Sequence, residues 1–202
     1  MPDTSNWFWN QLSTEGSALE NKELAMTDPE YTLMSKRLGF RMLDDHDLQN
    51  LMRLDMNPEV RAFFPEGVST PEQLREKIVR SRTSFLQKGF GEFSVTDLRT
   101  NEFLGRAGFA ELKNGEIEVG YLLLKEHWGK GIATEALSAL LDWAGKALSV
   151  PRIVAYAPTN HHASIGVMKK AGMRYLKTEP MHGVECIFYV YPLKPRDTPA
   201  ES

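Results

Sequence analysis

The sequence has very little cysteine and no long apolar run, and both shortages narrow what the protein can be. Its 202 residues include a single cysteine, Cys186, so no disulfide can form within the chain. We therefore expect a reducing, cytoplasmic setting, and Cys186, which lies in an apolar segment, favours a buried thiol over a nucleophile. Because no stretch of about 18 apolar residues is present, we expect no membrane span. The first residues lack the basic and apolar segments of a signal peptide.

An excess of charge of one sign is also missing. The 24 Lys and Arg residues nearly balance 27 Asp and Glu residues, which leaves a formal net charge of -3. Nucleic acids and anionic membranes attract strongly basic surfaces, so neither is an expected partner. The adjacent His161 and His162 have no cysteine or acid at metal-ligand spacing, so no metal site is expected.

Composition divides the chain into three parts. Residues 1–30 are polar apart from Trp7-Phe8-Trp9, and we predict an N-terminal extension that is either a tail or an arm docking on the domain or on a second copy. Residues 31–193 carry regular apolar patterns and are predicted to form one domain. Residues 194–202 are predicted to be a C-terminal tail. Both a monomer and a homodimer remain open.

The predicted domain mixes strand and helix patterns in the order β-α-α-β-β-β-α-β-α-β-β. Strands are predicted where apolar residues alternate or form short runs between turns, at 33–43, 91–98, 102–111, 116–125, 152–157, 173–177 and 184–192. Helices are predicted where apolar residues recur at helical spacing between start and stop signals, at 44–54, 70–87, 131 to about 144, and 161–171. This order indicates an α+β domain with about seven strands and about four helices.

The junction between a strand and a helix at residues 115–136 is the most informative segment. Its glycines bring several backbone N–H groups to the start of a helix, where the helix dipole adds positive character, so the junction suits a pyrophosphate. The segment Gly129-Lys130-Gly131-Ile132 cannot supply the Gly-Lys-Ser/Thr of a P-loop. A dinucleotide-binding fingerprint would need a glycine where Thr134 stands and an acid at the end of strand 152–157, and the sequence has neither.

Three segments resemble the GCN5-related N-acetyltransferase (GNAT) superfamily. Trp128 to Ala133 follows its Gln/Arg-x-x-Gly-x-Gly/Ala loop at Gly131 and Ala133, although Trp128 replaces the first residue. Asn160 to Met173 follows its Asn-x-x-Ala-Ser-Ile-x-Val-x-x-Lys-x-Gly-Phe helix, with Met173 for Phe. Ser35 to Arg41 is similar to the Thr-x-Arg-Leu-x-Leu-Arg start of the RimJ/RimL-like branch, which contains ribosomal-protein N-acetyltransferases. Together the matches span about residues 35–192.

The resemblance implies a fold and a cofactor. The fold is an α/β/α GNAT fold, in which a mixed, mostly antiparallel sheet splays between its fourth and fifth strands. The cofactor is acetyl-CoA, the acetyl donor, with no metal. The pantetheine arm would pair with backbone at Leu122, Leu123 and Leu124 and would bond Asn160, which otherwise reads as a helix N-cap. The pyrophosphate would be held by backbone N–H groups and one hydroxyl, at Gly129, Lys130, Gly131, Ile132, Ala133 and Thr134.

The resemblance also suggests catalytic groups. Glu118, in Glu118-Val119-Gly120-Tyr121, matches a frequent Glu-Ile-Gly-Tyr and is our candidate for the base that takes a proton from the amine. Glu111 and Glu116 are its rivals, and a solvated carboxylate is the plain alternative. Many relatives carry a tyrosine acid where Met168 stands here. Ser164 is therefore the candidate acid, unless its hydroxyl is structural.

The implied activity is an acetyl-CoA-dependent N-acetyltransferase. Direct attack of a primary amine in a ternary complex is expected, because no residue is placed to carry an acetyl group. The acceptor is either a protein α-amine or a small-molecule amine, and His182 is a candidate to face it. The alternative function is a non-catalytic sensor or scaffold that binds acetyl-CoA.

Overall fold

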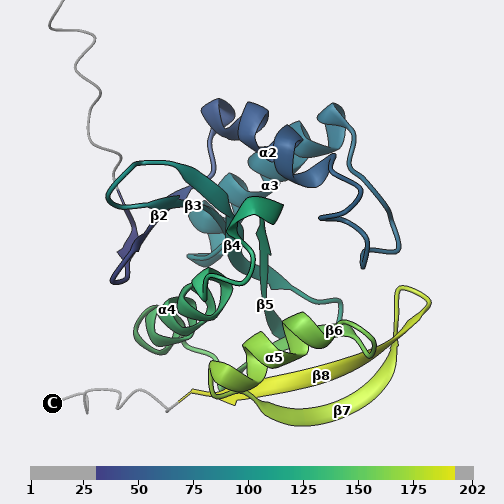
Figure 1. Ribbon diagram of the computed structural model, residues 1–202. Helices are drawn as coiled ribbons and strands as arrows, with labels where there is room; N and C mark the ends of the chain where they lie inside the picture. The colour runs from purple at the N-terminus through teal and green to yellow at the C-terminus, as the bar shows by residue number, and fades with distance from the viewer. Residues whose placement is uncertain (1–30, 194–202) are drawn as a thin grey trace, which may run out of the picture. The chain divides into compact units, whose positions relative to one another are not determined.

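A single eight-stranded sheet runs through the part of the chain that this computed structural model describes, residues 31–193 (Figure 1). Its order is β1-β2-β3-β4-β5-β6-β8-β7, and every neighbouring pair is antiparallel except β5–β6. The predicted α+β class with a mixed, mostly antiparallel sheet is confirmed. The strands are β1 (Leu33–Met34), β2 (Leu38–Met42), β3 (Glu92–Asp97), β4 (Phe103–Glu111), β5 (Ile117–Leu123), β6 (Arg152–Pro158), β7 (Arg174–Met181) and β8 (Val184–Pro192).

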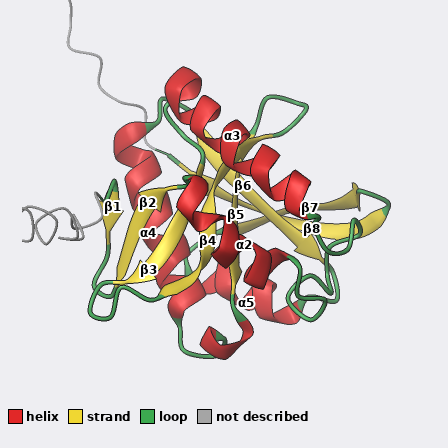
Figure 2. Ribbon diagram, turned by 90° about the horizontal axis from the view of Figure 1, so that it is seen from above, coloured by secondary structure: helices red, strands yellow, loops and turns green. Residues whose placement is uncertain are grey.

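Helices cover both faces of the sheet (Figure 2). They are α2 (Leu48–Asp55), α3 (Pro71–Lys88), α4 (Ile132–Ala147) and α5 (His162–Lys170), with short 3-10 turns η1 (Asp45–Asp47) and η2 (Lys125–His127). Local signals explain where they begin and end. Thr70 caps α3 in a capping box with Gln73, Pro71 follows it, and Gly89 ends the helix at a φ of 77°. Within residues 31–193 no helix is long and apolar enough to cross a membrane.

Two apolar cores lie on opposite faces, because successive strand side chains alternate between faces. The larger core packs α4 and α5 against the sheet and includes Phe93, Val119 and Leu137. The smaller core packs α2 and α3 on the other face around Leu51, Leu74 and Leu122. Val119 and Leu122 thus mark the two faces of β5.

The first predicted strand, 33–43, is two short strands in the structure. The chain turns at Ser35, whose N–H donates to the carbonyl of Leu38 at 2.8 Å, so β1 and β2 form a hairpin. Apolar alternation continues on both sides of the turn, which is why the sequence suggested one strand. The hairpin raises the predicted seven strands to eight and places Ser35 and Arg37 at a tight bend.

The sheet splays between β5 and β6, the fourth and fifth predicted strands. Both strands have seven residues, yet only two register pairs join them, Ile117 with Ile153 and Glu118 with Val154. Beyond Glu118 the two strands separate. The splay that the GNAT resemblance implied is therefore present, and it opens toward the end of β5 that leads into η2 and α4.

Candidate active site

The loop between β5 and α4 presents unpaired donors at a helix start. Gly129 and Gly131 have φ values of 73° and 75°, in the left-handed region that favours glycine. Gly131 is the N-cap of α4 and, as a glycine, contributes no side-chain hydrogen bond, so within residues 31–193 the N-cap leaves the amides of the first turn free. A Cβ at Gly129 would meet nothing within 4 Å. The predicted phosphate-binding residues therefore surround room for an anion, with Lys130 exposed and Ala133 and Thr134 half-buried.

Residues of the β1–β2 turn hydrogen-bond to this loop and to the first turn of α4. Glu135, in the first turn of α4, accepts hydrogen bonds from Ser35 Oγ at 2.8 Å and from the backbone N–H and Nε of Arg37 at 2.8 and 2.6 Å. Arg37 Nη1 also donates to the carbonyl of Lys130 at 3.2 Å. Burial raises the pKa of Glu135, but its bonds to Ser35 and Arg37 outweigh burial and lower it. The bend thus holds the loop and keeps Glu135 ionised.

Alternate residues of β5 turn their backbone N–H and C=O groups toward the splay. The N–H of Leu124 donates to Leu104 of β4 at 3.0 Å. Antiparallel alternation then turns the backbone of Leu122 toward β4 as well, and that of Tyr121 and Leu123 toward the opening. Of the three leucines predicted to meet pantetheine, only Leu123 presents its backbone there. The carbonyl of Leu123 accepts a bond from Trp128 Nε1 at 2.9 Å.

Asn160 lies on the exposed approach to α5. The N-cap of this helix is His161 and not Asn160, and no side chain caps it, so the predicted alternative role of Asn160 as an N-cap is wrong. The Asn160 carbonyl accepts a bond from the N–H of His162 at 3.0 Å. Its side chain has no hydrogen-bond partner among the described residues and remains open to a ligand.

Glu118 lies at the point where β5 leaves β6. It is half-buried, and within residues 31–193 no hydrogen bond or ion pair holds its carboxylate. Burial, followed by the negative charge of Glu92, raises the pKa of Glu118 to about 7. A carboxyl with this pKa is balanced between acid and base near neutral pH, which suits a general base.

A buried charge cluster lies on the same face of the sheet. Arg106 of β4 donates to Asp55 of α2 at 2.9 and 2.8 Å and to Glu92 of β3 at 2.8 Å. Lys77 of α3 reaches Glu92 at 3.1 Å. Burial raises the pKa of Glu92, but Arg106 and Lys77 outweigh it and hold the value at about 2. Glu92 is therefore a fixed negative charge in the neighbourhood of Glu118.

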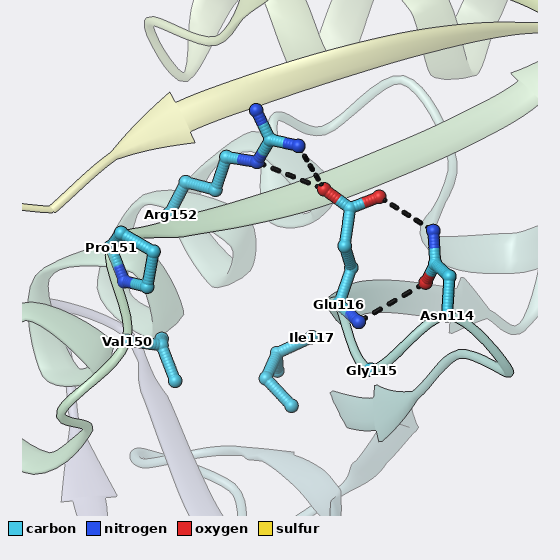
Figure 3. A pocket seen from close by; sticks show the side chains of 7 residues that line it. All are labelled: Asn114, Gly115, Glu116, Ile117, Val150, Pro151 and Arg152. Carbon is cyan, nitrogen blue, oxygen red and sulfur yellow. Dashed lines mark hydrogen bonds and ion pairs between the residues drawn. The ribbon is translucent and has the colours of Figure 1, made fainter.

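The rival carboxylates are already paired. Glu116 accepts bonds from Arg152 at 2.9 and 2.5 Å and from Asn114 at 2.9 Å (Figure 3). Burial raises the pKa of Glu116, but these partners outweigh it and lower the value. The hollow of about 380 Å³ around Glu116 lies beside the β4–β5 turn, at the other end of β5 from the glycine loop. Glu111 pairs with Lys88. Among the three candidates, Glu118 alone has a carboxylate without a described partner.

Ser164 faces Tyr121 across the splay. Its Oγ lies 2.9 Å from the Tyr121 hydroxyl, which also donates to the Ser164 carbonyl at 3.1 Å. Burial raises the pKa of Tyr121 to about 12. Alternation along β5 places Tyr121 on the face opposite Glu118, and the sequence did not predict its pairing with Ser164. Met168, where relatives carry a tyrosine, is buried in the larger core.

The segment 56–70, between α2 and α3, reaches the same region. Phe63 stacks on His161 with ring centroids 3.8 Å apart, and Glu66 Oε1 lies 3.4 Å from His182 Nδ1. His182, which lies at the β7–β8 turn, is thus paired with this segment. The segment, the start of α5 and the β7–β8 turn together border the α2/α3 side of the splay.

Comparison with known proteins decides the family. Residues 37–174 match the family described as Acetyltransferase (GNAT) domain. The chain belongs to the GNAT family. This GNAT protein is 33% identical over 152 residues to the uncharacterized protein YkkB of Bacillus subtilis strain 168, covering 72% of the chain and 87% of YkkB. It is 31% identical over 140 residues to the uncharacterized N-acetyltransferase p20 of Bacillus licheniformis, covering 68% of the chain and 79% of p20.

A solved structure agrees with this family. The GNAT protein resembles RimL, a ribosomal L7/L12 alpha-N-protein acetyltransferase determined in complex with coenzyme A, with a TM-score of 0.69 and 20% identity over 81% of this chain and 98% of RimL. The predicted family and fold are confirmed, and so is the predicted enzyme class, an acyltransferase.

Proposed function

We propose that the protein transfers the acetyl group of acetyl-CoA to a primary amine, by direct attack of the amine on the thioester in a ternary complex. The observation that carries this proposal is the splay itself. At one opening it brings together the start of α4, the edge of β5 beyond its pairs with β6 and the carboxylate of Glu118, and among the described residues none of these groups is capped or paired across the opening. GNAT membership and the coenzyme A bound to RimL support the choice of cofactor.

Each part of the opening suits one part of acetyl-CoA. The first-turn amides of α4 and the loop Gly129 to Ala133 would receive the pyrophosphate, with Thr134 adding a hydroxyl. The backbone of Tyr121 and the N–H of Leu123 would pair with the pantetheine arm, and Asn160 would bond the same arm. No metal is part of the proposal.

The chemistry needs a proton acceptor and a proton donor. Glu118 would take a proton from the ammonium group, and the neutral amine would form the new C–N bond to the acetyl carbon as the C–S bond breaks. A backbone N–H at the opening would stabilise negative charge on the acyl oxygen, an effect worth roughly 3–4 kcal/mol in other enzymes. The Ser164 hydroxyl, hydrogen-bonded to Tyr121, would give a proton to the departing thiolate and would be reprotonated by the second proton that the nitrogen loses as the amide forms.

The acceptor would be a protein α-amine or a small-molecule amine. RimL is a ribosomal L7/L12 alpha-N-protein acetyltransferase, which supports a protein α-amine without excluding a small-molecule amine. We further propose a cytoplasmic protein, a monomer or a homodimer, that acts without nucleic acid or membrane partners. The extension at 1–30, with Trp7-Phe8-Trp9, and the tail at 194–202 lie outside the described residues.

Thermal unfolding with and without acetyl-CoA tests the proposal first. A ligand present at about 100 times its dissociation constant adds about 2.7 kcal/mol. For a chain of this size we expect a rise of roughly 5–11 °C in the melting temperature. Gly131→Glu, which puts a carboxylate at the phosphate position, should remove most of the rise. Gly145→Glu is the matched control, because Gly145 is exposed on α4 away from the loop.

Release of coenzyme A thiol then separates enzyme from sensor. Peptides with free N-termini and small amines are offered as acceptors, and hydrolysis without an amine is subtracted. Acetyl-CoA binding with no amine-dependent thiol release would favour the sensor alternative, and absence of binding would remove both functions.

A further inference from the structure

Two paired glycines, Gly120 and Gly108, leave a strip of the α2/α3 face beside Glu118 without side chains. Gly120 of β5 pairs directly with Gly108 of β4, and Gly108 pairs with Glu92 of β3. Paired residues share a face, and alternation places Glu118 on that face as well. The strip therefore separates the carboxylate of Glu118 from the buried cluster around Arg106.

The two glycine positions differ in whether the structure could accept a larger residue. A Cβ at Gly108 would lie 2.3 Å from the carbonyl oxygen of Gly91, so packing excludes any larger residue there. Among residues 31–193, a Cβ at Gly120 would meet only Glu118 Oε1, at 3.9 Å, and the backbone φ of Gly120 is outside the left-handed region. Neither packing nor conformation demands glycine at position 120. What its missing side chain leaves is room beside the carboxylate.

That room opens at the splay, and the carboxylate of Glu118 is the charged group placed beside it. Glu118 and Val154 form the last pair between β5 and β6. Gly120 lies two residues beyond Glu118, where β6 has separated from β5. Tyr156, two residues beyond Val154, lies on the same face. Burial, then the neighbouring carboxylate of Glu118, raises the pKa of Tyr156. The cations of the neighbouring cluster are Arg106, Lys77 and Arg61, and each is paired with Asp55 or Glu92.

We propose that the space over Gly120 receives the ammonium group of the acceptor, beside Glu118. Gly120 then determines specificity, because its missing side chain sets how crowded the carbon bearing the amine can be. The inference rests on the proposed function and deepens it by naming where the amine binds. The acceptor class is a cationic primary amine whose amine-bearing carbon lies against bare backbone.

Charge-selective labelling of Gly120→Cys tests the position without turnover or acetyl-CoA. The introduced thiolate would attack a methanethiosulfonate, form a mixed disulfide and release methanesulfinate. We expect the cationic aminoethyl reagent to react about tenfold faster, relative to the anionic sulfonatoethyl reagent, than it does at Gly145→Cys on exposed α4. Any shift in thiol pKa cancels in this ratio. The wild-type chain, whose Cys186 is only 3% exposed, supplies the background rate.

Glu118→Gln in the Gly120→Cys background should bring the ratio close to that of Gly145→Cys. Three results would each overturn the proposal: labelling no faster than the wild-type background, no preference for the cation, or a preference that survives Glu118→Gln. Because labelling uses no cofactor, these failures leave the acetyltransferase function standing. A wild type that does not bind acetyl-CoA would instead remove that function.

Gly120→Ala provides a second, independent variant. Its methyl group fits the backbone, so we expect the melting temperature and its rise with acetyl-CoA to match wild type. With an amine that the wild type acetylates, KM should increase and kcat/KM should fall at least tenfold, more for amines on branched carbons than on CH2 groups. Unchanged kinetics for both kinds of amine would contradict the assignment.

Discussion

At the scale of single residues, Glu118 combines a half-buried position with a carboxylate that has no partner among residues 31–193. Its pKa is raised to about 7, first by burial and then by Glu92. The base must be ionised to accept a proton, so we expect kcat/KM to rise with pH through about 7 and then level off. Glu118→Gln should remove this rise and lower kcat/KM by about 10²–10⁴-fold. Glu116→Gln, a change to a carboxylate already paired with Arg152, should keep the wild-type profile.

Glu118 should also lower the free energy of unfolding at high pH. The pKa of Glu118 is about 7 in the folded chain, against 4.5 as the ordinary value. Stability from this group is complete below about pH 4.5 and is lost as pH rises through 7, because the folded chain retains the proton more strongly. Glu118→Gln does not titrate, so it should stabilise the protein by about 1–3 kcal/mol at pH 8 and hardly at all at pH 4. Denaturant unfolding at both pH values measures this, and an equal effect at both would contradict the buried environment.

At the scale of elements, the β1–β2 hairpin and the start of α4 act together through Arg37 and Glu135. We expect Arg37→Ala to weaken acetyl-CoA affinity about tenfold, because the loop loses its tie to Lys130 and Glu135 loses its neutralising partner. Isothermal calorimetry measures the change. Arg53→Ala is the matched control, since the Arg53–Glu126 pair has side chains 58% and 53% exposed and such pairs contribute about 0–1 kcal/mol. Equal losses in both variants would refute a specific role for the hairpin.

The buried cluster joins three elements through one guanidinium. Arg106→Met would leave Asp55 and Glu92 buried without their main partner, and Asp55 is fully buried. Breaking such a cluster on one side costs about 3–5 kcal/mol, so we expect a loss of this size in the free energy of unfolding. Arg75→Met, in an exposed pair with Glu72, should change it by less than about 1 kcal/mol. A small loss for Arg106→Met would show that water relaxes the cluster.

At the scale of the whole molecule, sequence patterns predicted the order of elements and the helix at 70–87, which is α3 (Pro71–Lys88) in the structure. They did not predict the bend at Ser35, because apolar alternation continues across it. Contacts between distant elements were also out of reach. Tyr121 and Ser164 are 43 residues apart and Arg37 and Glu135 are 98 apart, and neither partner has a local pattern that names the other. The motif pointed to Glu118, but only the pairing of Glu111 and Glu116 favours it over them.

The short pairing of β5 with β6 has a mechanical consequence. With two register pairs between them, the sheet is nearly two separate sheets, β1 to β5 and β6 to β8, that meet along one brief contact. A bound pantetheine arm would then act as a temporary strand, filling rungs that the chain itself leaves out. Hydrogen exchange should reveal this: the amides of Tyr121 and Leu123 should exchange faster than that of Leu122 in the empty protein and slow down when acetyl-CoA is added. The enzyme's sheet would be complete only while it holds its donor.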